Sequence, residues 1–427
     1  MKIKMPLPNK KQQSTHEQLN QRLKRLHHEY EQQLKAGHHQ MAYQKLLAAH
    51  HLVPQHPVIL ADLAYLELRL GHYHQAYQHY QQAIPHIDSS KIVNIYDGLT
   101  EVCHHLALDN ERQRYGALSV ALKKQQVMQV EKMRITQPRP VFDPSQPQQN
   151  IIAFSLFGAD PRYCETALLN VDYARQIYPA WTCRYYIDDS VPVEIQQKLR
   201  NKGAQVITVN TAQKAYSGLM WRFAVIDDPE VKFFLIRDAD SVVSYREAAA
   251  VNIWLQSDRW FHCMRDSYSH SELLLAGMWG GCVGVFNDIQ EKIQNYVKTD
   301  HYLSARVIDQ HFLRHCLWPT ISQSLMTHDS QAYEPNAIDL VTPKKQMPYE
   351  MESSFHVGSN YAAACVEIPV QYEQGAQLSW KLLDEQEQII CKYKSQVLEN
   401  RKIQVYLPRH YAQNIQQGQW KICLQAY

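Results

Sequence analysis

The chain has 427 residues, of which 45% are hydrophobic and 20% are charged, and its formal net charge is +2 at pH 7. This composition is globular and excludes an intrinsically disordered chain, while the length predicts two or three domains. The near-neutral charge excludes a general electrostatic attraction to nucleic acid or to an anionic membrane surface, so we expect no nucleic-acid partner.

Two segments in the first part of the chain repeat each other, GHHQMAYQKLLAA (37–49) and GHYHQAYQHYQQA (71–83). Each opens with a glycine that permits a tight turn, and small alanines recur where paired helices would approach closely. A third, less regular unit covers 91–125. We predict a helical domain over residues 1–135, and its period resembles the tetratricopeptide repeat. An unrelated pair of helical hairpins is the alternative.

The middle of the chain changes character. Four prolines within residues 136–149 predict a linker without helix. From residue 150 to 361, apolar runs alternate with segments of helical periodicity. Strands are predicted at 151–158, 183–191, 204–209 and 231–240, and helices between them at 163–178, 193–202 and 219–226. This alternation predicts an α/β fold with a doubly wound, mostly parallel sheet, whose ligands bind beyond the carboxyl ends of the strands.

The last stretch, residues 362–427, contains five short segments of alternating hydrophobicity separated by turn-forming residues. This pattern predicts a small antiparallel β domain. Its residues indicate no particular chemistry.

Cysteine usage and hydropathy bear on the location of the protein. Nine cysteines stand singly, with no Cys-x-x-Cys pair, which favours reduced thiols and a cytoplasmic protein. No run of about 18 apolar residues occurs, so we expect no transmembrane segment. The basic N-terminus lacks the apolar stretch of a secretion signal. Peripheral contact with a membrane stays open.

The strongest site motif is RDADS (237–241), at the end of an apolar run. On an extended backbone, alternate side chains such as Asp238 and Asp240 point the same way. Two converging carboxylates can hold Mn²⁺ or Mg²⁺, and a divalent cation stabilises the charge that gathers on a departing diphosphate. A pair of turn or helix-capping aspartates is the alternative.

Residues 150–361 resemble a glycosyltransferase domain of the GT-A fold. The segment WRFAVIDDPEVKFFLIRDADSVV (221–243) is similar to the block that contains the D-x-D motif in the glycogenin-like and related bacterial transferases. The resemblance implies a nucleotide-sugar donor, with a UDP-sugar favoured, and a metal ion held by Asp238 and Asp240 with the donor diphosphate. It also implies donor contacts from a wider set of residues: Ser155, Phe157, Gly158, Asp188, Asp189 and Arg222. The alternative for Asp188 and Asp189 is helix capping, and the alternative for Arg222 is a surface arginine.

Two downstream segments add to the predicted site. The glycines of GMWGGCVGVF (277–286) allow close backbone approach to a ligand, and we assign Gly280 and Gly281 to donor binding. The segment DQHFL (309–313) matches the D-Q-x-F-L block of these enzymes, which makes Asp309 a candidate acceptor-side or catalytic carboxylate. A helix N-cap is the alternative for Asp309.

Two further side chains complete the candidates. Asp266 lies in an M-R-D block similar to one that precedes the glycine segment in related sequences, and it is a second catalytic candidate, with a surface loop as the alternative. Related enzymes place a metal-binding histidine in a His-x-x-Gly segment after the core. FHVGSNY (355–361) has His-x-Gly instead, which makes His356 the candidate third ligand and leaves His328 as its rival.

We therefore predict a metal-dependent glycosyltransferase that moves a sugar from a nucleotide-diphosphate donor to a glycan, lipid-linked or protein acceptor, such as a surface polysaccharide or its assembly machinery. The helical domain would bind the acceptor or a protein partner. Two alternatives stay open. One is a non-catalytic scaffold with a relic transferase domain. The other is a nucleotidyltransferase, although FSLFGADPRY (154–163) is a poor match to the Gly-rich phosphate loop of that class.

Overall fold

The computed structural model describes residues 10–299, 307–361 and 364–425. The chain forms two compact units. Unit 1 consists of Met1–Gln126 with two short later segments, Tyr268–Ser271 and Gln331–Glu334, and unit 2 contains the rest. None of the described helices has the length and apolar character needed to cross a bilayer. The basic residues 1–9 lie outside the described ranges.

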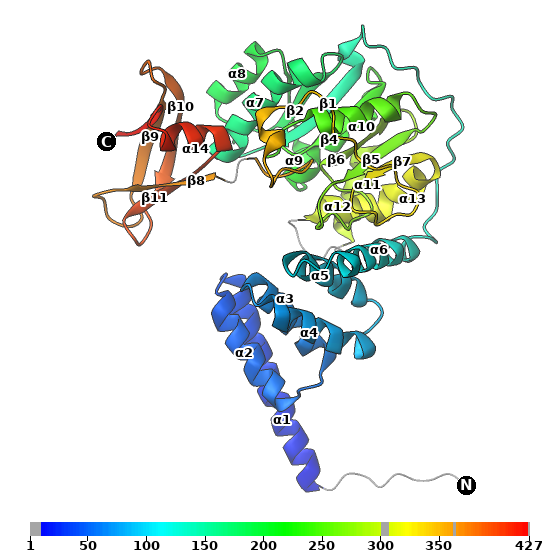
Figure 1. Ribbon diagram of the computed structural model, residues 1–427, viewed down its shortest axis with the longest axis vertical. Helices are drawn as coiled ribbons and strands as arrows, with labels where there is room; N and C mark the ends of the chain where they lie inside the picture. The colour runs from blue at the N-terminus through cyan, green and yellow to red at the C-terminus, as the bar shows by residue number, and fades with distance from the viewer. Residues whose placement is uncertain (1–9, 300–306, 362–363, 426–427) are drawn as a thin grey trace. The chain divides into compact units, whose positions relative to one another are not determined.

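Unit 1 contains the predicted helices, which pair in chain order into three hairpins (Figure 1). They are α1 (Lys10–Lys35), α2 (His39–Leu52), α3 (Pro57–Arg69), α4 (Tyr73–Ala83), α5 (Ile92–His105) and α6 (Asp109–Gln126). In each hairpin, the residue at the equivalent turn position has a left-handed backbone conformation, with φ of 76° at Gly37, 80° at Gly71 and 55° at Ala107. Each turn also repeats one pair of backbone hydrogen bonds back into the preceding helix.

The helices of unit 1 approach closely because small residues lie at their contacts. Ala42 and Ala76, which occupy the same place in the two repeated segments, are both completely buried. At Gly98, a methyl group would overlap the ring of Tyr80. Glycine there lets α5 pack directly on α4.

Unit 2 is built on a seven-stranded sheet of order β3-β2-β1-β4-β6-β5-β7. Its strands are β1 (Asn150–Leu156), β2 (Thr182–Ile187), β3 (Gln205–Thr208), β4 (Phe233–Arg237), β5 (Phe261–Arg265), β6 (Met278–Cys282) and β7 (Leu325–Asp329). Neighbours run parallel except around β6, which is antiparallel to β4 and β5. The predicted mixed α/β fold with a mostly parallel sheet is confirmed.

Helices cover both faces of this sheet. They are α7 (Pro161–Ile177), α8 (Val193–Asn201), α9 (Thr211–Lys214), the 3-10 helix η3 (Gly218–Asp227), α10 (Tyr245–Leu255), α11 (Ile289–Lys298), α12 (Ile308–Phe312) and α13 (Trp318–Ile321). Successive β4 residues point to opposite faces: the ring of Phe233 contacts Trp254 of α10, and Phe234 contacts Trp279. Trp279 in turn meets Phe223 of η3, which stacks on Phe312 of α12.

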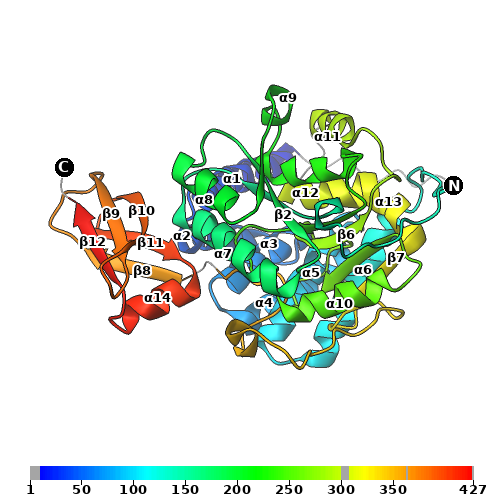
Figure 2. The ribbon, with the colours of Figure 1, turned by 90° about the horizontal axis from the view of Figure 1, so that it is seen from above.

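On the α10 face, Tyr178 at the end of α7 donates a hydrogen bond to Glu247 of α10 (2.9 Å). Figure 2 shows α7 and α10 on this same side of the sheet. Helices α7 and α10 therefore form one layer, and η3 and α12 belong to the other.

Three local predictions need correction. The segment 219–226 is the 3-10 helix η3 rather than an α-helix, and the Arg222 amide within it donates to Ser155 Oγ (3.0 Å), outside the helix. The linker 136–149 contains one 3-10 turn, Pro147–Gln149. Strand β4 ends at Arg237, so the D-x-D motif lies in the turn that follows and not on extended backbone.

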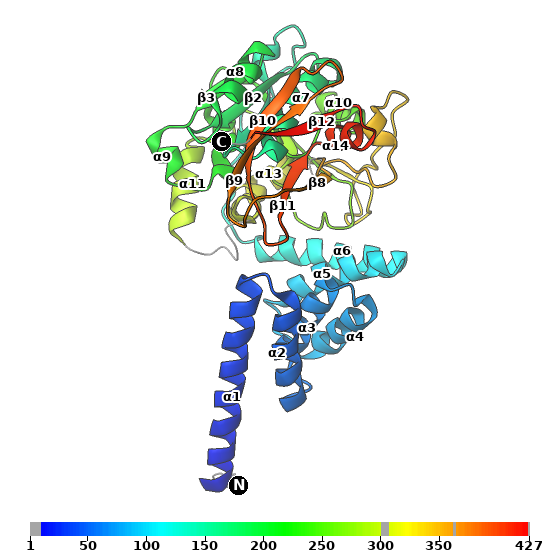
Figure 3. The same cartoon turned by 90° about the vertical axis from the view of Figure 1, so that its left-hand side faces the viewer.

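The C-terminal part also differs from its prediction. Within residues 364–425, five strands form two antiparallel sheets, β10-β9-β12 and β11-β8, and an unpredicted helix accompanies them (Figure 3). The elements are β8 (Ala364–Pro369), β9 (Gln377–Leu383), β10 (Ile389–Gln396), β11 (Lys402–Leu407), α14 (Arg409–Gln416) and β12 (Lys421–Gln425). The buried Glu165 carboxylate of α7 accepts hydrogen bonds from Tyr393 (2.7 Å) and Tyr411 (3.3 Å) and so fastens this part to the sheet domain. The predicted boundary before residue 362 borders residues outside the described ranges.

Candidate active site

A buried arginine contacts three other predicted site residues. Arg222 of η3 is 2% exposed and donates to Asp238 (2.5 Å), which follows β4, and to Asp309 (2.9 Å), in α12. Its backbone amide donates to Ser155 near the end of β1. Because the parallel strands β1 and β4 end at the same edge of the sheet, these elements converge there, as the fold class predicts.

The charges in this cluster depend on one another. Burial opposes the charge of Arg222, yet the carboxylates of Asp238 and Asp309 raise its pKa above the ordinary value. Burial raises the pKa of Asp309, and Arg222 opposes that rise. The second Asp309 oxygen accepts from the amide of Gln310 (2.9 Å). Since the N-cap of α12 is Val307, the capping alternative for Asp309 is wrong. Its carboxylate instead balances the charge of Arg222.

The second aspartate of the motif has a different partner. Asp240 forms an ion pair with Arg162 (3.3 Å), in the first turn of α7, a residue that the sequence analysis missed. Burial raises the pKa of Asp240, the nearby charge of Asp238 raises it further, and Arg162 opposes both effects. The two carboxylates thus lie near enough to influence each other, while each one is held by its own guanidinium.

The segment 355–361 lies against the motif, but its histidine does not join a metal cluster. The Tyr361 amide donates to the Asp240 carbonyl (2.9 Å), and Asn360 forms a β-bridge with Ser241. Among the described residues, no three or more His, Cys, Asp or Glu side chains gather as a metal site, so His356 is not placed with the two aspartates as a ready-made third ligand.

The rival histidine is internal. His328 lies on β7, is completely buried and shares a hydrogen bond of 2.8 Å with His262. Burial lowers its pKa to about 4. The structure therefore places His328 inside the sheet domain, which disfavours it as a metal ligand.

The structure gives Gly280 and Gly281 a packing role that does not depend on a donor. Both lie within β6, where a methyl group on Gly280 would lie 2.6 Å from the Phe234 carbonyl and one on Gly281 would lie 2.5 Å from the Phe261 ring. They are glycines because neighbouring protein fills their side-chain space. A methyl group on Gly277, just before β6, would overlap the Asp238 carboxylate. Gly277 is therefore the glycine of this segment that the site requires.

Asp266 follows β5 and belongs to a separate network. Arg246 donates to both of its oxygens (2.9 Å each), and the Ser330 hydroxyl (2.7 Å) and the Val357 amide (2.9 Å) also donate to the carboxylate. The structure does not bring Asp266 into the Arg222 cluster. Because both oxygens already accept hydrogen bonds, this arrangement favours a structural role for Asp266 over the predicted catalytic one.

The remaining predicted donor residues gather at the ends of β1 and β2. Gly158 (φ 79°) donates its amide to Ser190 Oγ (2.6 Å), and the Ser190 amide donates to Asp188 (3.1 Å). Asp189 is largely exposed, and an ion pair with Lys214 (2.6 Å) lowers its pKa.

Phe157 adds an aromatic surface at the end of β1. Its side chain is 42% exposed, and its ring packs edge-on against Trp221 at 5.6 Å between centroids. An exposed ring with fixed backing can stack on a flat ligand group.

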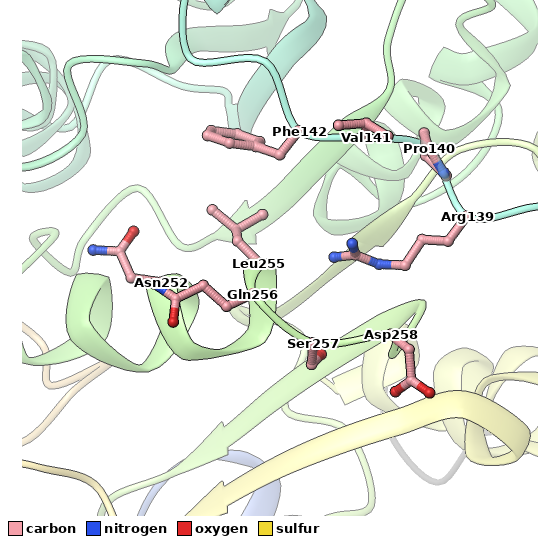
Figure 4. A pocket seen from close by; sticks show the side chains of 9 residues that line it. All are labelled: Arg139, Pro140, Val141, Phe142, Asn252, Leu255, Gln256, Ser257 and Asp258. Carbon is pink, nitrogen blue, oxygen red and sulfur yellow. The ribbon is translucent and has the colours of Figure 1, made fainter.

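An open cavity lies away from the Arg222 cluster (Figure 4). Its volume is about 640 Å³, and it lies between linker residues 139–142 and the end of α10 with the turn after it. Because α10 runs from the carboxyl end of β4 back towards the start of β5, this cavity is at the amino edge of the sheet. Ligands of such sheets bind at the other edge.

No protein-family model matches the chain, and no curated protein matches it. Weak likenesses to solved structures exist. An O-GlcNAc transferase mutant from Thermobaculum terrenum has 13% identity and a TM-score of 0.25, with 51% of this chain and 46% of that chain covered. A 4-diphosphocytidyl-2C-methyl-D-erythritol synthase from Anaerococcus prevotii has 8% identity and a TM-score of 0.27, with 43% and 89% covered. This chain thus spans about half of the first protein, and neither likeness is close enough to support an argument.

Proposed function

We propose that the chain is a divalent-metal-dependent glycosyltransferase of the GT-A type, which transfers a sugar from a nucleotide-diphosphate donor, with a UDP-sugar favoured. The observation that supports it most directly is the Arg222 cluster: a buried guanidinium positions Asp238 beside Asp240 at the carboxyl edge of a mostly parallel sheet. The acceptor, whether glycan, lipid-linked or protein, is not defined by these residues.

The residues present suit a hard cation. Asp238 and Asp240 supply two interacting carboxylates, which Mn²⁺ and Mg²⁺ prefer, and such ions commonly bind one or two carboxylates while substrate phosphates and water complete the shell. A third protein ligand is therefore not required. When bound, the ion would act as a Lewis acid on the diphosphate oxygens.

The chain's own residues supply the remaining functions. Arg222 fixes Asp238, and Asp309 keeps the charge of Arg222 balanced inside the protein. The exposed ring of Phe157 and the turn from Asp188 to Ser190 offer a surface for the nucleoside next to Gly158. Arg162 and the N-terminal end of the 17-residue helix α7 add positive potential on the diphosphate side.

The direct test is turnover of a panel of nucleotide sugars with Mn²⁺, with release of the nucleoside diphosphate measured for the wild type and for Asp240→Asn. The substitution keeps the shape and removes one charge, so we expect a rate loss on the order of a hundredfold or more. Lys402→Gln, an exposed ion-pair residue of the C-terminal sheets, is the control and should behave as the wild type.

Release of pyrophosphate instead of a nucleoside diphosphate would favour the nucleotidyltransferase alternative. Absence of both turnover and metal-dependent UDP binding at millimolar nucleotide would favour the scaffold alternative. Either result would overturn the proposed function.

A further inference from the structure

Arg162 and Asp240 form an internal ion pair at the place where the proposed function puts a metal ion. The guanidinium is 29% and the carboxylate 22% exposed, so the pair is only partly screened by solvent. The Arg162 Nε atom is buried and has no hydrogen-bond partner among the described residues, so the guanidinium is not fully satisfied in this position. The guanidinium also lies over the ring of Tyr163, at 5.2 Å from the centroid, a contact that leaves its N–H groups available for a second hydrogen-bond acceptor.

The charge balance around the motif supports the same view. Three carboxylates and two guanidiniums form ion pairs here: Arg222 with Asp238 and Asp309, and Arg162 with Asp240. Arg222 is buried between two of the carboxylates, whereas Arg162 pairs with one carboxylate among the described residues, Asp240, and is more exposed to solvent. Of the two arginines, Arg162 therefore needs less free energy to separate from its carboxylate partner.

We propose that Arg162 is a resident counter-cation of the metal site: it neutralises Asp240 in the metal-free protein, is displaced when a divalent cation binds, and then pairs with the donor diphosphate. The inference rests on the proposed function and concerns the regulation of that same site. It makes metal and nucleotide binding mutually dependent, because the cation alone must break the Arg162–Asp240 pair, whereas the diphosphate offers the released guanidinium a new partner.

The position of Arg162 suits this exchange. It lies in the first turn of α7, next to the cap formed by Asp160, which accepts a hydrogen bond from the Arg162 amide (2.8 Å). Its backbone is thus fixed while the long side chain can reorient. The dipole of the 17-residue helix α7 favours negative charge at this end, so a released guanidinium and the helix dipole would attract the same phosphate.

The test measures Mn²⁺ binding to the full chain by electron paramagnetic resonance of the free ion, with and without UDP. It compares the wild type with Arg162→Gln and Arg162→Lys, and uses Arg175→Gln as the control. Arg175 is on the same helix and is exposed, with an ion pair to Asp172 (3.8 Å). Without nucleotide, we expect Arg162→Gln to bind Mn²⁺ about tenfold more tightly than the wild type, equivalent to about 1.4 kcal/mol.

UDP should strengthen Mn²⁺ binding strongly in the wild type, and this enhancement should shrink by about tenfold in Arg162→Gln. Arg162→Lys keeps the charge and should restore most of the coupling, while Arg175→Gln should match the wild type. Equal or weaker Mn²⁺ binding by Arg162→Gln without nucleotide would overturn the inference but leave the proposed function standing. If neither the wild type nor Arg162→Gln bound Mn²⁺ with or without UDP, both would fall.

Discussion

Gly277→Ala tests how the fold supports the D-x-D motif. A methyl group at Gly277 would overlap the Cγ and Oδ2 atoms of Asp238 and lie 3.0 Å from Oδ1, where ordinary contact begins at 3.4 Å. Gly277 does not have a left-handed backbone, so alanine adds no conformational strain. The change should therefore act on the Asp238 carboxylate and leave the chain folded.

The carboxylate has to move by about 1 Å or more, and a misplacement of about 1 Å at a reacting site costs on the order of a hundredfold in rate. The same movement should weaken the ion pair of Asp238 with Arg222. We expect Gly277→Ala to lose about two orders of magnitude in donor turnover, with weaker metal-dependent UDP binding and a melting temperature near that of the wild type.

Gly280→Ala is the matched control within the same segment. Its methyl group would meet the Phe234 carbonyl and the Leu235 side chain, each at 2.6 Å, and not the motif. Overpacking of this kind typically costs about 1–3 kcal/mol of stability. Gly280→Ala should therefore lower the melting temperature, and at temperatures where it remains folded it should keep far more turnover than Gly277→Ala. Turnover and UDP binding of Gly277→Ala at wild-type levels would refute the assignment of Gly277 to the support of Asp238.

Two predictions concern stability. Burial lowers the pKa of His328 from 6.5 to about 4. Between these two pH values the histidine is protonated in the unfolded chain but neutral in the folded protein. The free energy of unfolding should therefore fall as the pH is lowered from 6.5 to 4, by up to about 3 kcal/mol from this group. His328→Gln should reduce that dependence in urea unfolding measured at both pH values, and an unchanged difference would contradict it. In unit 1, the buried Lys123 ammonium donates to both oxygens of Asp97 (2.9 Å each) and to the Ser271 carbonyl (3.0 Å). Lys123→Met should cost about 2 kcal/mol in thermal unfolding, and its neighbour Lys124→Met, at a more exposed ion pair, less than about 1 kcal/mol; equal effects would argue against the buried network.

Much of the fold could be predicted because each element has its own local signal. β1 is buried along its whole length, and its sequence, NIIAFSL, is mostly apolar. The hairpin turns of unit 1 need a residue with a left-handed backbone conformation, and the glycines at 37 and 71 indicate such turns in the sequence. Ala107 takes the same conformation in the third hairpin without that signal. Helix α14 was missed because its segment is short and dominated by polar residues.

The glycine segment shows why glycines in a sequence do not by themselves locate a ligand. Glycine is required wherever another group occupies the space of a side chain, whether that group is a ligand or the protein itself. At Gly280 and Gly281 the occupant is the neighbouring strands, and at Gly277 it is the Asp238 carboxylate. The antiparallel insertion of β6 between β4 and β5 creates this crowding. The order in which strands pair cannot be predicted from the local sequence pattern of any one strand.

The aspartates were found by sequence, whereas the cations that hold them were only partly found. Arg222 could be proposed from the block around the motif, but Arg162 is 78 residues away from its partner and lies in an otherwise ordinary first helical turn. A carboxylate motif indicates that negative charge gathers at a strand end. It does not indicate which arginine balances that charge in the free protein. Because Arg222 is fixed by two carboxylates and Arg162 by one, the same motif contains a permanent and an exchangeable counter-charge. That difference follows from burial and topology, and it makes Arg162 the side chain whose replacement should change metal binding while the fold stays intact.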